Sequence, residues 1–200
     1  MHKPASTDVP IHDLIRERWS PRAFSDQSAS HEVLRGLFEA ARWAPSSNNE
    51  QPWVYLVATK EDAQNFAKIV GVLVEFNADW AKHAPVLAIS VANLKLRDGK
   101  PNRVALHDVG SASAQLTLEA ASRGLFVHQM AGFHMAKARE TFGIPPDWEP
   151  VAAMAIGYPG NPDTLAQKLR ERELAERTRK PLKEFVMTGT WGRPAPFVSS

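Results

Sequence analysis

Two short arginine clusters, one near each end of the chain, constrain its fold more than any other feature. The first has Arg18, Ser20 and Arg22 at alternate positions, and the second has Arg177 and Arg179. The forked donors of guanidinium groups, backed by a serine hydroxyl, match the oxygens of a phosphate. If both clusters bind one phosphate, the fold must bring the two ends of the chain together.

A polar turn lies between the two clusters and is stiffened by two prolines. It runs from Ala44 to Trp53 and reads Ala-Pro-Ser-Ser-Asn-Asn-Glu-Gln-Pro-Trp. Its hydroxyl and amide groups suit the polar edge of a flat ligand. The same composition is also typical of an ordinary turn after a helix, so both interpretations stay open at this point.

The composition limits the class of protein. The chain has 200 residues, of which 44% are hydrophobic and 23% charged, and we expect a single domain over residues 1–200 with 184–200 as a C-terminal arm. No apolar run approaches the ~18 residues of a membrane helix, and the first eight residues lack the apolar core of a signal peptide. Because there is no cysteine, disulfides, thiolate metal sites and a cysteine nucleophile are excluded. We expect a cytoplasmic protein without a membrane partner.

The small net charge of +2 is unevenly distributed. Residues 168–183 carry seven basic side chains against three acidic ones, a local charge of +4. One interpretation is a nucleic-acid patch, and the other is a solvated helix with paired Glu and Arg side chains. We favour the second and expect no nucleic-acid partner.

Hydrophobic periodicity predicts a mixture of helices and strands. A 3.6-residue apolar period predicts helices, and runs of β-branched and aromatic residues predict strands. Residues 71–83 show no clear pattern. We expect helices from Pro10 to before Pro21, from Ser30 to before Pro45, and over 61–70, 104–123, 134–142 and 164–177, the last capped by Asp163. We expect strands over 53–58, 85–92, 125–130 and 151–157.

Two of these segments are expected in the interior. Strand 85–92 is almost continuously apolar, which implies burial on both faces. Helix 104–123 is rich in Ala, Ser and Gly, which lets another helix approach closely, and Gly124 ends it. The tail after residue 183 is too apolar for a free segment and too broken by Gly and Pro for a helix, so we expect it to pack on a partner subunit.

The chain lacks the motifs of several enzyme classes. No Gly-x-Gly-x-x-Gly follows a strand, and neither a Walker loop nor a Gly-x-Ser-x-Gly elbow occurs. None of the seven histidines forms a His-x-x-x-His pair or a cluster with metal-ligand spacing, so we expect no metal site. A chain poor in acid–base motifs but equipped for a phosphate suggests an enzyme whose cofactor carries the chemistry.

Five segments, in order, resemble the motifs of the FMN-dependent nitroreductase family. Each is weak alone, but together they cover nearly the whole chain. They are Arg18-x-Ser20-x-Arg22-x-Phe24, Ala44-Pro45-Ser46 with Asn49-x-Gln51-Pro52-Trp53, Gly124-Leu125 with Gly132-Phe133, Ile156-Gly157-Tyr158-Pro159, and Arg177-x-Arg179-x-Pro181. The resemblance implies an α+β fold with a mixed or antiparallel central sheet flanked by helices. It also implies an intertwined homodimer with two FMN sites at the interface and the C-terminal arm on the partner.

The resemblance further implies which residues contact FMN. The two arginine clusters would bind its phosphate and ribityl chain, and the turn after Ala44 would come from the other subunit and border the isoalloxazine ring. Asn77 would contact the pyrimidine edge, and the backbone N–H groups of Ala131 and Gly132 would face N5 and O4. The expected cofactor-binding residues are Arg18, Trp19, Ser20, Arg22, Pro45, Ser46, Asn49, Gln51, Asn77, Gln129, Met130, Ala131, Gly132, Arg177 and Arg179. Trp80 stands where some members have a lysine, three residues after the asparagine.

The implied activity is that of an NAD(P)H-dependent flavin oxidoreductase with ping-pong kinetics. Reduced nicotinamide would give a hydride to flavin N5, so that no catalytic side chain is required. An electron-poor small molecule, such as a nitroaromatic or a quinone, would then take two electrons. Both NADH and NADPH stay open as donors. The alternative is an FMN-binding protein for flavin storage or sensing without nicotinamide-driven turnover.

Overall fold

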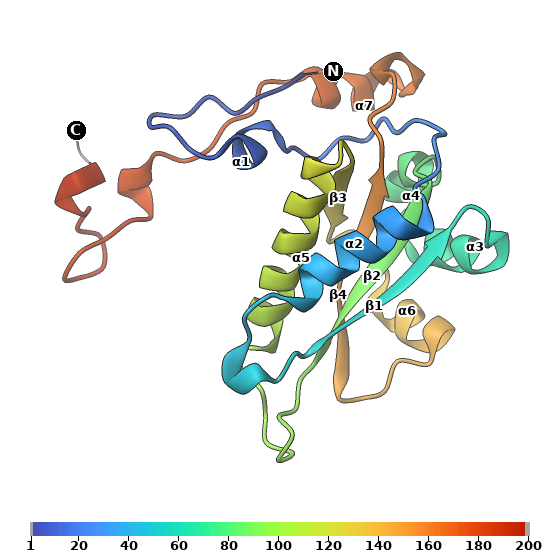
Figure 1. The fold of residues 1–200 in the computed structure, drawn as a ribbon, viewed down its shortest axis with the longest axis horizontal. Helices are drawn as coiled ribbons and strands as arrows, with labels where there is room; N and C mark the ends of the chain where they lie inside the picture. Colours follow the sequence, from blue (N-terminus) through green and yellow to red (C-terminus); the bar gives the residue numbers. More distant parts are fainter. Residues whose placement is uncertain (1, 199–200) are drawn as a thin grey trace.

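The computed structural model describes residues 2–198, with an antiparallel four-stranded sheet at its centre (Figure 1). The strand order is β1-β2-β4-β3. The strands are β1 (Trp53–Thr59), β2 (Val86–Asn93), β3 (Phe126–Met130) and β4 (Trp148–Gly157). In the central pair, Leu87 lies opposite Ala155, and the register shifts between Ser90 and Val91. All four predicted strands are confirmed, and the central sheet is antiparallel rather than mixed.

Helices surround this sheet. They are α1 (Asp13–Glu17), α2 (His31–Arg42), α3 (Ala63–Val72), α4 (Glu75–Ala81), α5 (Ala105–Ser122), α6 (Met135–Phe142) and α7 (Gln167–Leu174). Ser30 caps α2 as predicted, because its hydroxyl accepts a hydrogen bond from the Val33 N–H. Within the described part of the chain, no helix is both long and apolar enough to cross a membrane.

One face of the sheet is covered by α2 and α5 (Figure 1). Leu37 of α2 and Leu116 of α5 are fully buried there against Val86 and Met154 of the central strands. Each buried leucine contributes about 1.5–3 kcal/mol relative to an exposed one. The small residues of α5 let α2 lie close to it, which confirms that this helix is internal.

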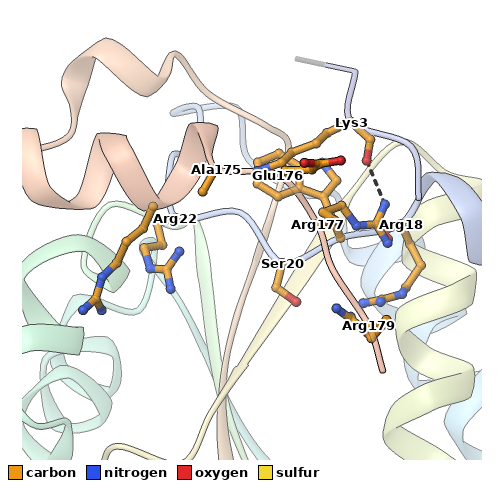
Figure 2. Close-up of a pocket in the computed structure, with 10 residues that line it drawn as sticks. Lys3, Arg18, Ser20, Arg22, Ala175, Glu176, Arg177 and Arg179 are labelled. Carbon is orange, nitrogen blue, oxygen red and sulfur yellow. Dashed lines mark hydrogen bonds between the residues drawn. The ribbon is translucent and has the colours of Figure 1, made fainter. Parts of the chain in front are cut away.

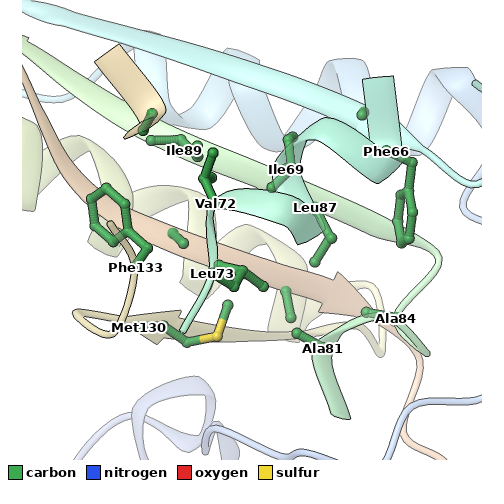
Figure 3. Packing of buried hydrophobic residues seen from close by; sticks show 14 of the residues in the cluster. Phe66, Ile69, Val72, Leu73, Ala81, Ala84, Leu87, Ile89, Met130 and Phe133 are labelled. Atoms are coloured by element: carbon green, nitrogen blue, oxygen red, sulfur yellow. The ribbon is translucent and has the colours of Figure 1, made fainter. Parts of the chain in front are cut away.

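The opposite face carries α3, α4 and α6, and its core is shown in Figure 3. Leu87 and Ile89 of β2 point to this face, whereas Val86 and Ala88 belong to the α2–α5 side. Successive strand residues point to opposite faces, so an apolar run without alternation means that both faces are covered. The prediction for this strand is confirmed, and here both faces of an antiparallel sheet are buried.

Two helix predictions need correction, and one segment without a prediction is helical. The N-terminal helix is only α1, whose N-cap is His12, so Pro10 lies outside it. Asp163 caps no long helix, because the Asn161 side chain caps a 3-10 turn over Pro162–Thr164 and α7 begins only at Gln167. Residues 71–83, which showed no pattern, contain the whole of α4.

The two ends of the chain run side by side beyond the sheet (Figure 1). Residues after α7 are extended, and the guanidinium group of Arg177 donates to the carbonyl of Lys3 at 2.7 Å. The C-terminal tail then leaves the body of the molecule and folds back on itself, with Met187 bridged to Pro194. Trp191 is 95% exposed and Phe197 is 77% exposed.

Candidate functional site

The first arginine cluster lies on an extended segment whose side chains alternate between the core and a cavity. Trp19, Pro21 and Ala23 are buried. The residues between them, Arg18, Ser20 and Arg22, are partly exposed and line the cavity. Because the side-chain period of an extended chain is two, the spacing Arg-x-Ser-x-Arg places its three polar side chains on one side.

The core fixes this segment from beneath. Nδ1 of His128 donates a hydrogen bond to the Pro21 carbonyl at 2.8 Å, because a carbonyl oxygen can only accept, so Nδ1 carries a proton. Burial is the main cause that lowers the pKa of His128 to about 4, which keeps the ring uncharged at neutral pH. His128 therefore supports the first arginine cluster as a neutral core residue.

The end of β4 holds the segment from its other side. The Gly160 N–H donates to the Ala23 carbonyl at 2.9 Å, and the Ser25 N–H donates to the Tyr158 carbonyl at 3.0 Å. A Cβ on Gly160 would lie 2.5 Å from the Phe24 backbone, so only glycine permits this approach. The Gly-Tyr-Pro motif after β4 therefore positions the first arginine cluster.

The second cluster joins the first through Arg177. Its guanidinium group donates to the carbonyls of Lys3, Arg16 and Arg18 at 2.7–2.9 Å. These three bonds hold the extended segment after α7 that carries Arg177 and Arg179, here called the strap, against the N-terminal segment. Arg177 is thus occupied with backbone oxygens, while Arg179 extends from the same strap toward Arg18 (Figure 2).

Both clusters line one cavity of about 180 Å³. Figure 2 shows Ser20 between Arg22 on one side and Arg18 with Arg179 on the other. The lining residues are Lys3, Arg18, Trp19, Ser20, Arg22, Arg172, Ala175, Glu176, Arg177 and Arg179. The cavity therefore gathers six cationic side chains from segments that lie up to 176 positions apart.

The cationic side chains of this cavity repel one another. Burial lowers the pKa of Arg18, and the charge of Arg179 adds to this effect. Burial also lowers the pKa of Arg22, against the opposing influence of Glu173, and the pKa of Lys3 and of Arg177 for the same primary reason. Nε of Arg22 is buried without a hydrogen-bond partner. A dianion in the cavity would relieve the repulsion between these cations.

Asn77 and Gly132, expected at the pyrimidine edge and near N5, lie together. Nδ2 of Asn77 donates to the Gly132 carbonyl at 2.9 Å, and a Cβ on Gly132 would lie 2.5 Å from that nitrogen. Ala131, just after β3, is exposed, as is Gln129, whereas Met130 is buried in the core. This places Ala131 and Gly132 at an accessible strand end.

Trp80, which stands in the lysine position of some relatives, is a core residue. It is 1% exposed, and its ring stacks on Phe24 with centroids 6.4 Å apart. The guanidinium carbon of Arg22 lies 6.0 Å from the Trp80 ring centroid, within reach of a cation–π contact. Trp19 is similar: it lines the cavity but packs edge-on against Phe126.

The polar turn is not brought to this cavity within one chain. Residues 45–51 follow α2 and lie at the opposite end of the molecule from α7 (Figure 1). Asn48, Asn49 and Gln51 all have positive φ, between 50° and 55°. The buried Asp108 of α5 holds this turn by accepting from the Ser47 N–H at 3.1 Å. Ser46 supports it with a bond from the Gln51 N–H, and Pro45 is exposed.

Sequence reasoning missed Lys3, Arg172 and Glu173. Glu173 is 1% exposed, and its carboxylate accepts from the N–H groups of Arg22 and Ala23 at 2.9–3.0 Å. One signal was present: Glu173 lies four residues after Leu169, the other buried side chain of the polar helix α7. The expected pairing of Glu and Arg along this helix therefore does not hold for Glu173, which faces the core.

The residues present fit an FMN molecule. The cation cavity suits its phosphate, and the Asn77–Gly132 pair offers polar groups for its ring. Among the described residues, no group of three or more His, Cys, Asp or Glu side chains has the arrangement of a metal site.

Comparisons with known proteins agree with this arrangement. The family model described as the nitroreductase family matches residues 15–158. A Mycolicibacterium smegmatis protein, described as an uncharacterized 15.4 kDa protein in the ask 5′ region, is 37% identical over 131 residues, which cover 66% of this chain and 87% of that protein. A Stenotrophomonas maltophilia protein, provisionally named an NADH dehydrogenase/NAD(P)H nitroreductase, is 26% identical over 188 residues, or 84% and 94% of the two chains.

A solved structure gives the same result for the fold. A crystal structure described as an oxidoreductase containing FMN is 32% identical to this chain and superposes with a TM-score of 0.89. The match covers 94% of this chain and 96% of the other. The family model spans well over half of the sequence, and the motifs that it includes build the arginine segment, the polar turn and the strand ends described above. This chain belongs to the nitroreductase family.

Proposed function

We propose that this protein is an FMN-dependent oxidoreductase that takes electrons from NADH or NADPH and reduces an electron-poor small molecule, such as a nitroaromatic or a quinone. The observation that carries the proposal is the convergence of Arg18, Ser20, Arg22 and Arg179 on one cavity in a nitroreductase-family chain. The FMN in a structural relative and the nicotinamide in another relative's name support it.

Each part of the site has a physical task. Arg18, Ser20 and Arg179 bind and orient the phosphate through charge-assisted hydrogen bonds, each worth about 1.5–3 kcal/mol when well formed. Asn77 and the backbone around Gly132 orient the ring. Bound FMN would supply the two-electron transfer between nicotinamide and acceptor. The hydride step needs no side-chain acid or base, so the tasks of these residues are to bind and orient the cofactor.

The proposal includes a homodimer. The turn at residues 45–51 lies far from the cation cavity of its own chain. The C-terminal tail carries exposed aromatic side chains. A second copy would bring its turn to the ring and receive the tail. Exposed Trp191 and Phe197 are the side chains expected to dock there.

The test is a spectrum of the purified protein followed by anaerobic titration with NADH and with NADPH. We expect a yellow protein whose flavin absorbance is bleached by at least one nicotinamide and restored by a nitroaromatic or a quinone. A colourless protein that FMN does not reconstitute would overturn the proposal. A yellow protein that neither nicotinamide bleaches would instead favour flavin storage or sensing.

A further inference from the structure

A carboxylate lies where a phosphate-binding site is expected to have none. Glu173 comes from α7, is 1% exposed, and faces the segment that carries Arg18, Ser20 and Arg22. It is the buried acidic group nearest to a cavity lined by six cations. Nothing in the binding of FMN described above uses it, so its burial needs another explanation.

The contacts of Glu173 connect three segments. Its carboxylate accepts the Arg22 N–H at 2.9 Å and the Ala23 N–H at 3.0 Å, and it lies 3.8 Å from Nη1 of Arg22. Its backbone carbonyl accepts from Nζ of Lys3. Four residues later, Arg177 binds the carbonyl of Arg18. Glu173 therefore lies at the junction of the N-terminal segment, the first arginine cluster and the strap of the second.

We propose that Glu173 is a positioning residue that sets the distance between the two arginine clusters and thereby selects FMN over riboflavin. This inference rests on the proposed FMN site. By occupying the N–H groups of Arg22 and Ala23, the carboxylate fixes the backbone of the first cluster against α7. The phosphate is then left to the side chains that line the cavity, among them Arg18, Ser20, Arg22 and Arg179.

The two possible effects of this carboxylate on FMN have opposite signs. If Glu173 acted only through its charge, its removal would make the cavity more positive and FMN would bind more tightly. If Glu173 acts by position, replacing one carboxylate oxygen with an NH2 group weakens its bonds to the Arg22 and Ala23 N–H groups, lets Arg22 move, and weakens FMN. The sign of the change therefore decides between the two roles.

The test compares Glu173→Gln with Glu176→Gln, both measured as apoprotein titrated with FMN and with riboflavin. Glu176 lines the same cavity and is exposed, so E176Q removes the same charge without touching the backbone of Arg22. We expect E173Q to weaken FMN by about tenfold or more and riboflavin by less than about threefold, since only the phosphate end changes. We expect E176Q to bind FMN as tightly as the wild type or more tightly.

Several results would overturn the inference. Tighter or unchanged FMN binding by E173Q would do so, as would an equal loss of FMN and riboflavin affinity, or an equal loss in E176Q. If wild-type apoprotein itself does not bind FMN, the proposed function fails instead.

Amide hydrogen exchange covers the case in which E173Q does not fold. In wild-type apoprotein we expect slow exchange at Arg22 and Ala23, because their N–H groups are bonded to a buried carboxylate. Exchange at these two amides as fast as in the exposed loop around Gly99 would also contradict the positioning role.

Discussion

The cation cavity and the polar turn at residues 45–51 are each held by a buried carboxylate, but they are assembled differently. In each, a buried carboxylate from a helix accepts backbone N–H groups of a loop: Glu173 holds Arg22 and Ala23, and Asp108 holds Ser47. The cavity, however, is assembled from both ends of one chain, whereas the turn is exposed and has three residues with positive φ.

This difference separates a site that one chain preorganises from a turn that we propose to act with a second copy. The cationic side chains of the cavity are already gathered within one chain, because the folding of the core overcomes the repulsion between them. Only the anion is needed to complete this site. A turn held in a sparsely populated backbone conformation persists only when its surroundings fix it. Within one chain those surroundings are Asp108 and, for the Asn49 carbonyl, the guanidinium group of Arg97.

The largest effect is expected from the double variant Arg18→Ala/Arg179→Ala. Loss of two charge-assisted contacts should weaken FMN by at least about a hundredfold, while riboflavin changes little. Fluorescence titration of the apoprotein measures both. The control is Arg35→Ala, an exposed arginine on α2. An FMN affinity within about threefold of the wild type, a difference of about 0.65 kcal/mol, would refute the phosphate assignment.

Acid should destabilise the protein through His128, which supports the first arginine cluster. The pKa of His128 is lowered to about 4 in the folded protein, against 6.5 for an ordinary histidine. Between these values the unfolded chain binds the proton and the folded chain does not, so stability is lost as pH falls from 6.5 toward 4. The loss is up to about 3 kcal/mol.

Urea unfolding at several pH values measures this dependence. The variant His128→Asn keeps a donor for the Pro21 carbonyl but does not titrate, so its stability should fall less over the same range. Parallel curves for the variant and the wild type would assign the acid sensitivity to other groups.

The turn is tested by Asp108→Ala. Removal of the carboxylate leaves the Ser47 N–H without its acceptor, and we expect a stability loss of about 1–3 kcal/mol. Because the turn is proposed to border the ring, FMN and riboflavin affinities should fall by the same factor, in contrast to Glu173→Gln. The matched variant Asp108→Asn keeps one acceptor oxygen and should lose less. A loss of affinity confined to FMN would mean that the turn and the cation cavity do not act separately on the ligand.

The smallest effect is expected from Trp191→Ala. This side chain is 95% exposed, so its removal should change the stability of one chain by less than about 0.5 kcal/mol. If it docks on a second copy, the dissociation constant of the dimer should rise by about tenfold or more, which sedimentation at several concentrations measures. An unchanged dimer would place the tail outside the interface.

Elements with a strong local pattern were predictable from the sequence. The apolar run of β2 and the small-residue helix α5 lie where expected, because the pattern of each reports its own burial. The α2 cap at Ser30 was also readable, since capping is a contact over three residues.

Elements that depend on distant contacts were not predictable in the same way. Residues 18–20 were predicted as the end of a helix, but a bond from Arg177 to the Arg18 carbonyl and bonds to residues 21–23 hold the segment extended. Here tertiary contacts outweigh local propensity. In contrast, α7 begins later than the capping pattern at Asp163 indicates because of a local contact, since Asn161 caps a separate turn there.

The sequence by itself determined which side chains are available for an anion and a polar ring edge. Arg18, Ser20 and Arg22 lie on one side only because tertiary contacts hold their backbone extended. Only the tertiary structure decided that Arg179 lies near these side chains and that Arg177 donates to backbone carbonyls instead. It also decided that a buried Glu173 joins the two clusters. The order of the sheet strands and the closure of the chain ends set these distances, and no local pattern in the sequence encodes them.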